Sequence, residues 1–93
     1  MTTFRPFPIK DGSHKLGEAH VSEDAITAKC GNGEGPYEKV AREWRGIMTA
    51  NDGTEVAVAC WDWKGSLSDP KPYVSIWAAD TVYLLEWLNF LVA

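Results

Sequence analysis

Residues 54–63, TEVAVACWDW, place the strongest constraint on how this chain folds. The stretch is rich in β-branched and aromatic residues and contains neither glycine nor proline, which is typical of a β-strand. Its alternate residues form two faces, with Ala57, Ala59, Trp61 and Trp63 on one and Val56, Val58, Cys60 and Asp62 on the other. Both faces are apolar as far as Asp62, so the sequence predicts a central strand that is covered on both sides.

The flanking segments predict partners for this strand. Residues 50–54, Ala-Asn-Asp-Gly-Thr, carry a hairpin signal and follow an apolar run. We expect a short helical turn at about 36–42 and then a strand at about 43–50. Residues 37–48 also fit helical spacing, so a helix stays open as the alternative. After a loop at 64–72, residues 73–77 predict a further strand.

The end of the chain predicts a helix from residue 81 to about 92, with Asp80 as its cap. Leucines form a wide apolar stripe on it, while Tyr83, Trp87 and Phe90 occupy much of the remainder. Such a helix is sandwiched in the core or presents its aromatic residues to a partner. The apolar stretch is 13 residues long, whereas a membrane span needs about 20, so we expect a buried helix.

The first third of the chain gives weaker signals. Residues 1–22 suit an extended arm or an edge strand, with a turn at Asp11-Gly12. Residues 25–30 alternate as a narrow strand, and the glycines of 31–35 predict a mobile loop. We therefore expect one α+β domain over residues 1–93. Three to four antiparallel strands form a meander, and the C-terminal helix packs on one face.

Composition narrows the class of partner and the compartment. The 93 residues include nine Lys and Arg against thirteen Asp and Glu, a net charge of −4. This balance argues against direct nucleic-acid binding. The N-terminus lacks the apolar segment of a signal peptide, so we expect a cytoplasmic protein in which Cys30 and Cys60 are free thiols. We expect no association with membranes.

Residues capable of chemistry do not fall into recognisable patterns. The spacing of His14, His20, Cys30 and Cys60 matches no zinc motif, and Ser13-His14 lies in a turn-like segment rather than a dry site. The glycine-rich loop lacks the spacing and the lysine of a phosphate-binding loop. We interpret the basic cluster of Lys39, Arg42, Arg45 and Trp44 as a solvated face. No catalytic residue, cofactor or metal is therefore predicted.

Acidic residues at turns and strand ends are the main candidate for a binding surface. Carboxylates there are expected to project outward, where they complement a partner that presents Lys and Arg. Trp61 is expected in the core beneath the last helix, against Trp77 and Trp87, whereas Trp63 near the strand end is expected as an exposed anchor. The candidate partner-binding residues are Glu23, Asp24, Asp52, Glu55, Asp62, Trp63 and Asp69.

In size, acidity and lack of catalytic residues the chain resembles, in kind, small inhibitors carried by phages and mobile elements, such as anti-CRISPR proteins. That resemblance transfers no functional residue. The leading hypothesis is a non-enzymatic inhibitor that occupies the basic, nucleic-acid-binding surface of a larger protein. One alternative is a homo-oligomeric structural or accessory subunit, for example a homodimer, joined through Tyr83, Trp87 and Phe90. A further alternative is a domain that binds a small ligand or a metal.

Overall fold

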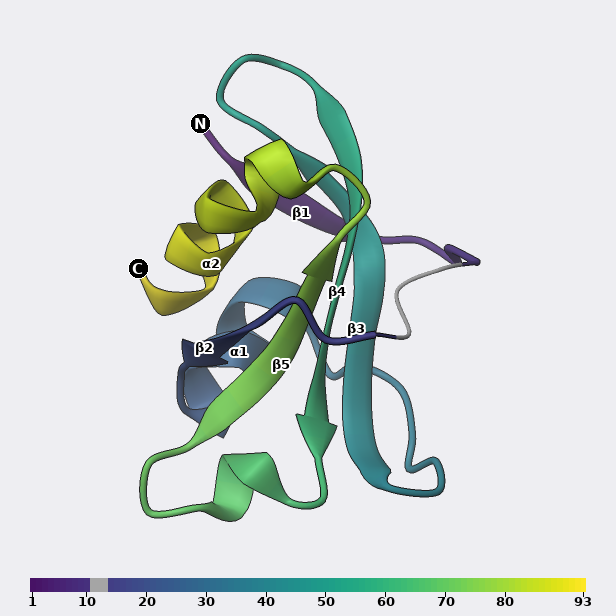
Figure 1. The fold of residues 1–93 in the computed structure, drawn as a ribbon, viewed down its shortest axis with the longest axis vertical. Helices are drawn as coiled ribbons and strands as arrows, with labels where there is room; N and C mark the ends of the chain where they lie inside the picture. The colour runs from purple at the N-terminus through teal and green to yellow at the C-terminus, as the bar shows by residue number, and fades with distance from the viewer. Residues whose placement is uncertain (11–13) are drawn as a thin grey trace.

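The computed structural model describes residues 1–10 and 14–93, which form a five-stranded antiparallel sheet with two α-helices on one side (Figure 1). The strand order is β1-β3-β4-β5-β2. The strands are β1 (Thr3–Pro6), β2 (Gly17–His20), β3 (Val40–Thr49), β4 (Glu55–Trp63) and β5 (Tyr73–Ala78), and the helices are α1 (Glu23–Cys30) and α2 (Leu84–Val92). The predicted α+β class is confirmed, but three to four strands is too few.

The first 22 residues explain the difference in strand number. β1 pairs with β3 along one edge of the sheet, and β2 pairs with β5 along the other. Both strands are only four residues long, and Pro6 and Gly17 weaken their signal in the sequence. The turn predicted at Asp11-Gly12 and the Ser13 hydroxyl lie outside the described residues.

β4 is the central strand, as predicted. It pairs with β3 along one edge and with β5 along the other. Its two faces are covered along most of its length, because Val56, Val58 and Cys60 lie in the main core and Ala59 and Trp61 are buried on the other face. The hairpin between β3 and β4 is also confirmed, since Ala50 N donates to Thr54 O at 2.8 Å. Gly53 adopts φ 86°, a left-handed conformation that favours glycine and explains the turn signal.

The helical turn expected at 36–42 is wrong, because β3 begins at Val40 and contains a bulge between Val40 and Glu43. The helical spacing of apolar residues in this segment is outweighed by the pairing of β3 with β1 on one edge and with β4 on the other. Gly46 lies opposite Pro6, where a Cβ atom would stand only 2.1 Å from Arg5 O, so the glycine that weakens a helix is what admits β1.

The strand expected at 25–30 is also wrong, because these residues lie in α1. The Ser22 hydroxyl caps the helix by accepting from Ala25 N at 3.1 Å, and Glu23 and Asp24 stand in its first turn. Ile26 and Cys30, four residues apart, are its buried side chains. The N-terminal cap and the burial of two side chains one helical turn apart therefore favour a helix, although the short alternation of apolar residues had predicted a strand.

The main core lies between the sheet and the two helices. Trp87 of α2 is fully buried, and its indole N–H donates to Ala59 O of β4 at 3.0 Å. Its ring stacks on Phe4 of β1 at 5.4 Å and on Phe90 at 5.9 Å. The helix predicted from residue 81 begins as the 3-10 turn Thr81–Tyr83, which Asp80 caps because its Oδ1 accepts from Val82 N at 3.0 Å, and α2 continues from Leu84.

The face of the sheet opposite the helices, called the open face below, carries Trp61 and Trp77. The expectation that these residues pack beneath the last helix is wrong. Cys60 faces the helices, so its neighbour Trp61 must face away, and Trp61, Trp77 and Ala59 form a second apolar cluster. Ile9 packs against this cluster from the chain that leaves β1 on the side away from the helices (Figure 1).

Replacing Trp87 with Phe should lower the free energy of unfolding by about 2 kcal/mol, because Ala59 O loses its donor and the smaller ring leaves a void. Urea denaturation measures this change. Leu85→Ala, on the exposed side of the same helix, is the matched control and should change stability by about 0.5 kcal/mol or less. Equal losses in the two variants would contradict this account of the core.

Candidate functional site

The structure divides the predicted partner-binding residues among three places. Asp52 and Glu55 lie at the β3–β4 hairpin, whereas Trp63 and Asp69 lie at the other end of β4 and in the loop that follows. Because β4 has nine residues, its ends are separated by about 27 Å. Glu23 and Asp24 begin α1, and Glu23 pairs with Arg42 at 3.5 Å. The seven residues therefore do not form one surface.

Asp62 is not accessible, which corrects the prediction that it projects outward. The residue is only 4% exposed. Its Oδ1 accepts from Gly65 N at 2.7 Å and from Ser66 N at 3.0 Å, while Oδ2 accepts from Leu67 N at 3.4 Å. The carboxylate therefore holds the turn after β4 and has no role as a contact for a partner.

Four carboxylates lie near the β3–β4 hairpin and the start of α2, and this group is called the acidic end below. It contains Asp52 and Glu55, which the sequence reading selected, together with Asp80 and Glu86, which it missed. Glu55 alternates with buried Val56 and so points to the open face, where Arg5 pairs with it. Thr2 and Asn51 both donate to Glu86 Oε2, at 2.7 and 2.8 Å, and so tie β1, the hairpin and α2 together. Sequence separation hid this grouping, because Glu86 stands 35 residues from Asn51.

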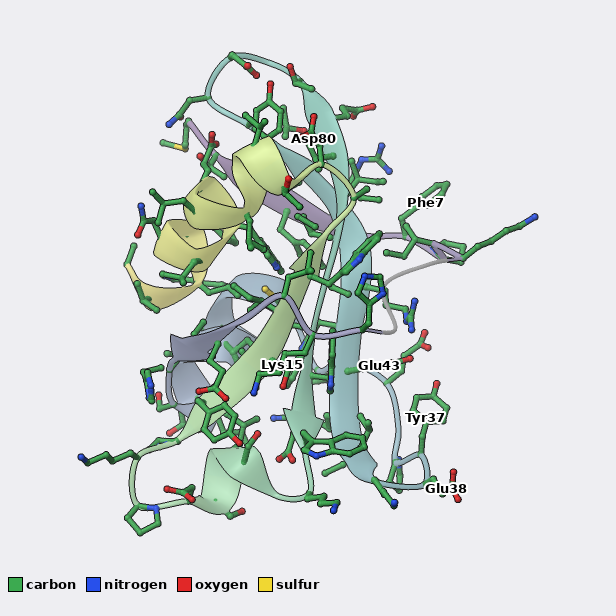
Figure 2. All side chains as sticks on the ribbon, in the orientation of Figure 1. Phe7, Lys15, Tyr37, Glu38, Glu43 and Asp80 are labelled. Atoms are coloured by element: carbon green, nitrogen blue, oxygen red, sulfur yellow. The ribbon has the colours of Figure 1, made fainter. Side chains whose placement is uncertain are left out.

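The acidic end carries most of the net charge of the chain. Its four carboxylates and the nearby Arg5, which pairs with Glu55 at 3.2 Å, supply three of the four net negative charges. The remaining eight Lys and Arg residues nearly balance the remaining nine Asp and Glu residues. Figure 2 shows Asp80 at this end of the molecule, with Tyr37 and Glu38 at the opposite end.

Asp52 is held in its charged form. The Tyr83 hydroxyl donates to its Oδ2 at 2.7 Å and Thr54 N donates to its Oδ1 at 2.8 Å. The Tyr83 hydrogen bond is the largest of the influences that lower the pKa of Asp52, and the bonds from Thr54 add to it. This carboxylate therefore stays ionised below the pH at which an ordinary aspartate is protonated.

Apolar side chains border the acidic end. Val82 is 81% exposed and Leu85 is 66% exposed, so both stand in water beside Asp80 and Glu86. The aromatic residues that the sequence reading offered to a second copy are placed differently. Trp87 is fully buried, while Tyr83 and Phe90 are half-buried against the main core.

A second group of side chains, His20, Tyr73 and Trp63, lies across β2, β5 and β4 and is called the aromatic row below. His20 pairs with Tyr73 in the β2–β5 register, and their rings lie 6.0 Å apart. The Ser66 hydroxyl accepts from Trp63 N at 3.1 Å and donates to Tyr73 O at 2.7 Å, so it holds the ends of β4 and β5 together. Trp63 is exposed, as predicted.

The basic cluster noted in the sequence does not form a platform. Trp44 is buried in the main core, and its indole N–H donates to Gly31 O at 2.8 Å. Arg42 lies over its ring at 4.9 Å, and Arg45 pairs with Glu43 at 3.3 Å on the other face of β3. Alternation along the strand separates the indole from Arg45.

Among the described residues, a pocket of about 660 Å³ lies between the chain after β1 and the loop after α1. Phe7, Trp44 and Gly33 are among its lining residues. Both cysteines are buried and free, and burial raises the pKa of Cys30 to about 12 and that of Cys60 well above its usual value. Both thiols are therefore protonated at neutral pH and are poor nucleophiles.

Residues 1–10 and 14–93 contain no group of three or more His, Cys, Asp or Glu side chains placed to hold a metal ion. Among the described residues, no helix is both long and apolar enough to span a membrane. Comparison with protein-family models, with curated proteins and with solved structures finds no match to this chain.

Replacing Asp62 with Ala should lower the free energy of unfolding by about 2–3 kcal/mol, because three backbone N–H groups lose their acceptor. Asp69→Ala, in the same loop and exposed, removes the acceptor of a single backbone group, Lys71 N, and should cost about 1 kcal/mol or less. Thermal or urea unfolding of the two variants checks this difference. Similar stability in both would mean that Asp62 does not hold the turn.

Replacing Tyr83 with Phe should raise the pKa of Asp52, because the main hydrogen bond to its charged form is lost. A carboxyl whose pKa is lowered by folding adds stability above its unfolded pKa and loses it as the pH falls through the folded value. Tyr83→Phe should therefore destabilise the chain more at pH 7 than at pH 2.

A carbon-detected NMR titration of the Asp52 carboxyl measures the pKa directly. Tyr37→Phe, which removes the hydroxyl that donates to Glu34, is the matched control and should leave the pKa of Asp52 unchanged. An unaltered Asp52 titration in Tyr83→Phe would refute the assignment of the shift to this hydrogen bond.

Proposed function

We propose that this chain is a non-enzymatic protein-binding module whose acidic end docks on a surface of a larger protein lined by Lys and Arg. The partner class is a nucleic-acid-handling protein, whose phosphate-binding surface the carboxylates occupy. The chain then acts as a small inhibitor of the kind that phages carry, in the cytoplasm of the host. Buried free thiols are compatible with such a reducing compartment.

The concentration of charge at the acidic end is the observation that carries this proposal. Three of the four net negative charges belong to Asp52, Glu55, Asp80, Glu86 and Arg5. Asp52, Asp80 and Glu86 accept hydrogen bonds from neighbouring backbone or hydroxyl groups, so their carboxylates are held in place before any partner arrives. Preorganised charge of one sign speeds association with a surface of the opposite sign.

The exposed apolar residues complete the surface. Burying the exposed side chains of Val82 and Leu85 against a partner would contribute favourable binding free energy. Charge pairs at a surface contribute little to the affinity by themselves. An apolar centre with a charged rim is the usual anatomy of a protein interface. The acidic end therefore combines a source of affinity with a source of specificity.

Self-association through the same surface is less favourable. A symmetric contact at the start of α2 would bring the carboxylates of two copies together, and like charges across an interface oppose binding. Trp87, the largest of the residues offered to a second copy, is committed to the core. The ligand-binding alternative rests on the pocket beside Phe7, where Glu34, Glu43 and Arg45 are the charged lining residues.

A triple variant tests the acidic end without unfolding it. Asp52→Asn, Glu55→Gln and Asp80→Asn together remove three charges, yet each amide keeps an oxygen that accepts a hydrogen bond. Affinity purification with the wild-type chain followed by mass spectrometry identifies the partner. We expect the triple variant to lose it, and to associate with the purified partner at least tenfold more slowly at low salt.

The matched control removes the same number of charges elsewhere, through Glu23→Gln, Asp24→Asn and Asp69→Asn. This control should recover the same partner as the wild-type chain. If the acidic-end variant binds the partner as rapidly as the control does, or if the recovered surface is acidic, the proposal is wrong.

A further inference from the structure

We infer that the aromatic row is a second binding surface, which takes single-stranded nucleic acid by stacking bases on His20, Tyr73 and Trp63. This surface lies on the open face, at the far end of β4 from the acidic end. It is separate from the protein-binding surface proposed above and does not depend on it.

The geometry of the row suits stacking. His20, Tyr73 and Trp63 come from three adjacent strands, which lie about 5 Å apart, so their rings follow one another across the sheet. The β4–β5 register ends where Trp61 pairs with Ser75. Beyond it the Ser66 hydroxyl bridges Trp63 N and Tyr73 O, which keeps these two residues near each other at the ends of β4 and β5. Sheets that bind single-stranded RNA stack two or three bases on aromatic residues in such an arrangement.

Contacts with neighbouring residues hold the aromatic row in place. Trp61 is buried next to Trp63 on the same face, and the Ser66 hydroxyl connects the backbones of Trp63 and Tyr73. Ser66 is itself fixed by its N–H, which donates to Asp62. The buried carboxylate of Asp62 therefore helps to position the backbone that carries the exposed indole.

Lysine ammonium groups lie over two of these rings. Lys15, labelled in Figure 2, lies over the Tyr73 ring at 5.5 Å, and Lys64 lies over the Trp63 ring at 5.7 Å. A third lysine, Lys71, lines together with His20 a hollow of about 350 Å³ beside the row. A base that stacks on either ring takes the place of the ammonium group, which then stays within reach of the phosphate that follows the base.

The net charge of −4 predicted no direct nucleic-acid binding, but that value is a sum over the whole chain. The structure separates the charges, because Glu55 at the acidic end lies about 27 Å along β4 from Trp63. Around the aromatic row stand Lys15, Lys64 and Lys71 together with Glu18 and Asp69, and Glu18 is paired with Lys15. This end of the molecule therefore does not repel phosphates as the acidic end does.

Fluorescence anisotropy with a labelled twelve-nucleotide oligo(U) tests the inference on the full chain. We expect binding that weakens about five- to hundredfold in Trp63→Ala, and that is largely retained in Trp63→Phe, which keeps a ring. Lys64→Gln should reduce the slope of log affinity against log salt by about 0.7, because one phosphate contact is lost.

Phe7→Ala is the matched control, because Phe7 is an aromatic side chain of similar exposure outside the row, and it should leave oligonucleotide binding unchanged. The triple variant of the acidic end should also retain this binding, so failure here and failure of the protein-binding proposal are distinguishable. Equal affinity in Trp63→Ala and Phe7→Ala, no binding to oligo(U) or oligo(dT), or a preference for neutral oligosaccharides would overturn the inference.

Discussion

The hydrogen bond from the Trp87 indole to Ala59 O joins the C-terminal helix to the central strand, and the two faces of the molecule depend on it. It fixes α2 on one side of β4, so Cys60 turns toward the helices and Trp61 turns away. Phe4 and Phe90 stack on the same indole, which brings β1 to the helix as well. A small domain has few such contacts, so each one carries a large share of its stability.

This division gives the molecule two ends of different chemistry. The acidic end gathers carboxylates from the hairpin and α2, whereas the aromatic row gathers rings and lysines where β4 and β5 meet the loop that joins them. Opposite ends of one strand allow both surfaces to be occupied at once.

The sequence predicted an element correctly where several local signals, such as propensity, alternation and capping, indicated the same structure over several positions. β4, the Asn51-Asp52-Gly53 turn and the Asp80-capped helix are confirmed because propensity, alternation and capping point to the same structure. α1 was missed because two short patterns competed, and burial of Ile26 and Cys30 against the core favoured the helix. The edge strands were uncertain because four residues carry too little pattern to identify a partner.

The sequence by itself determined the central strand, its hairpin, the final helix, the acidic balance and the exposure of Trp63 near a strand end. Only the tertiary structure decided which carboxylates stand together, because Glu86 reaches Asn51 across 35 positions of sequence. It also decided that Asp62 is buried as an acceptor for three backbone N–H groups. The residues around a position predict which element it belongs to and which face of that element it occupies. Its neighbours in space depend on how the elements pack against one another.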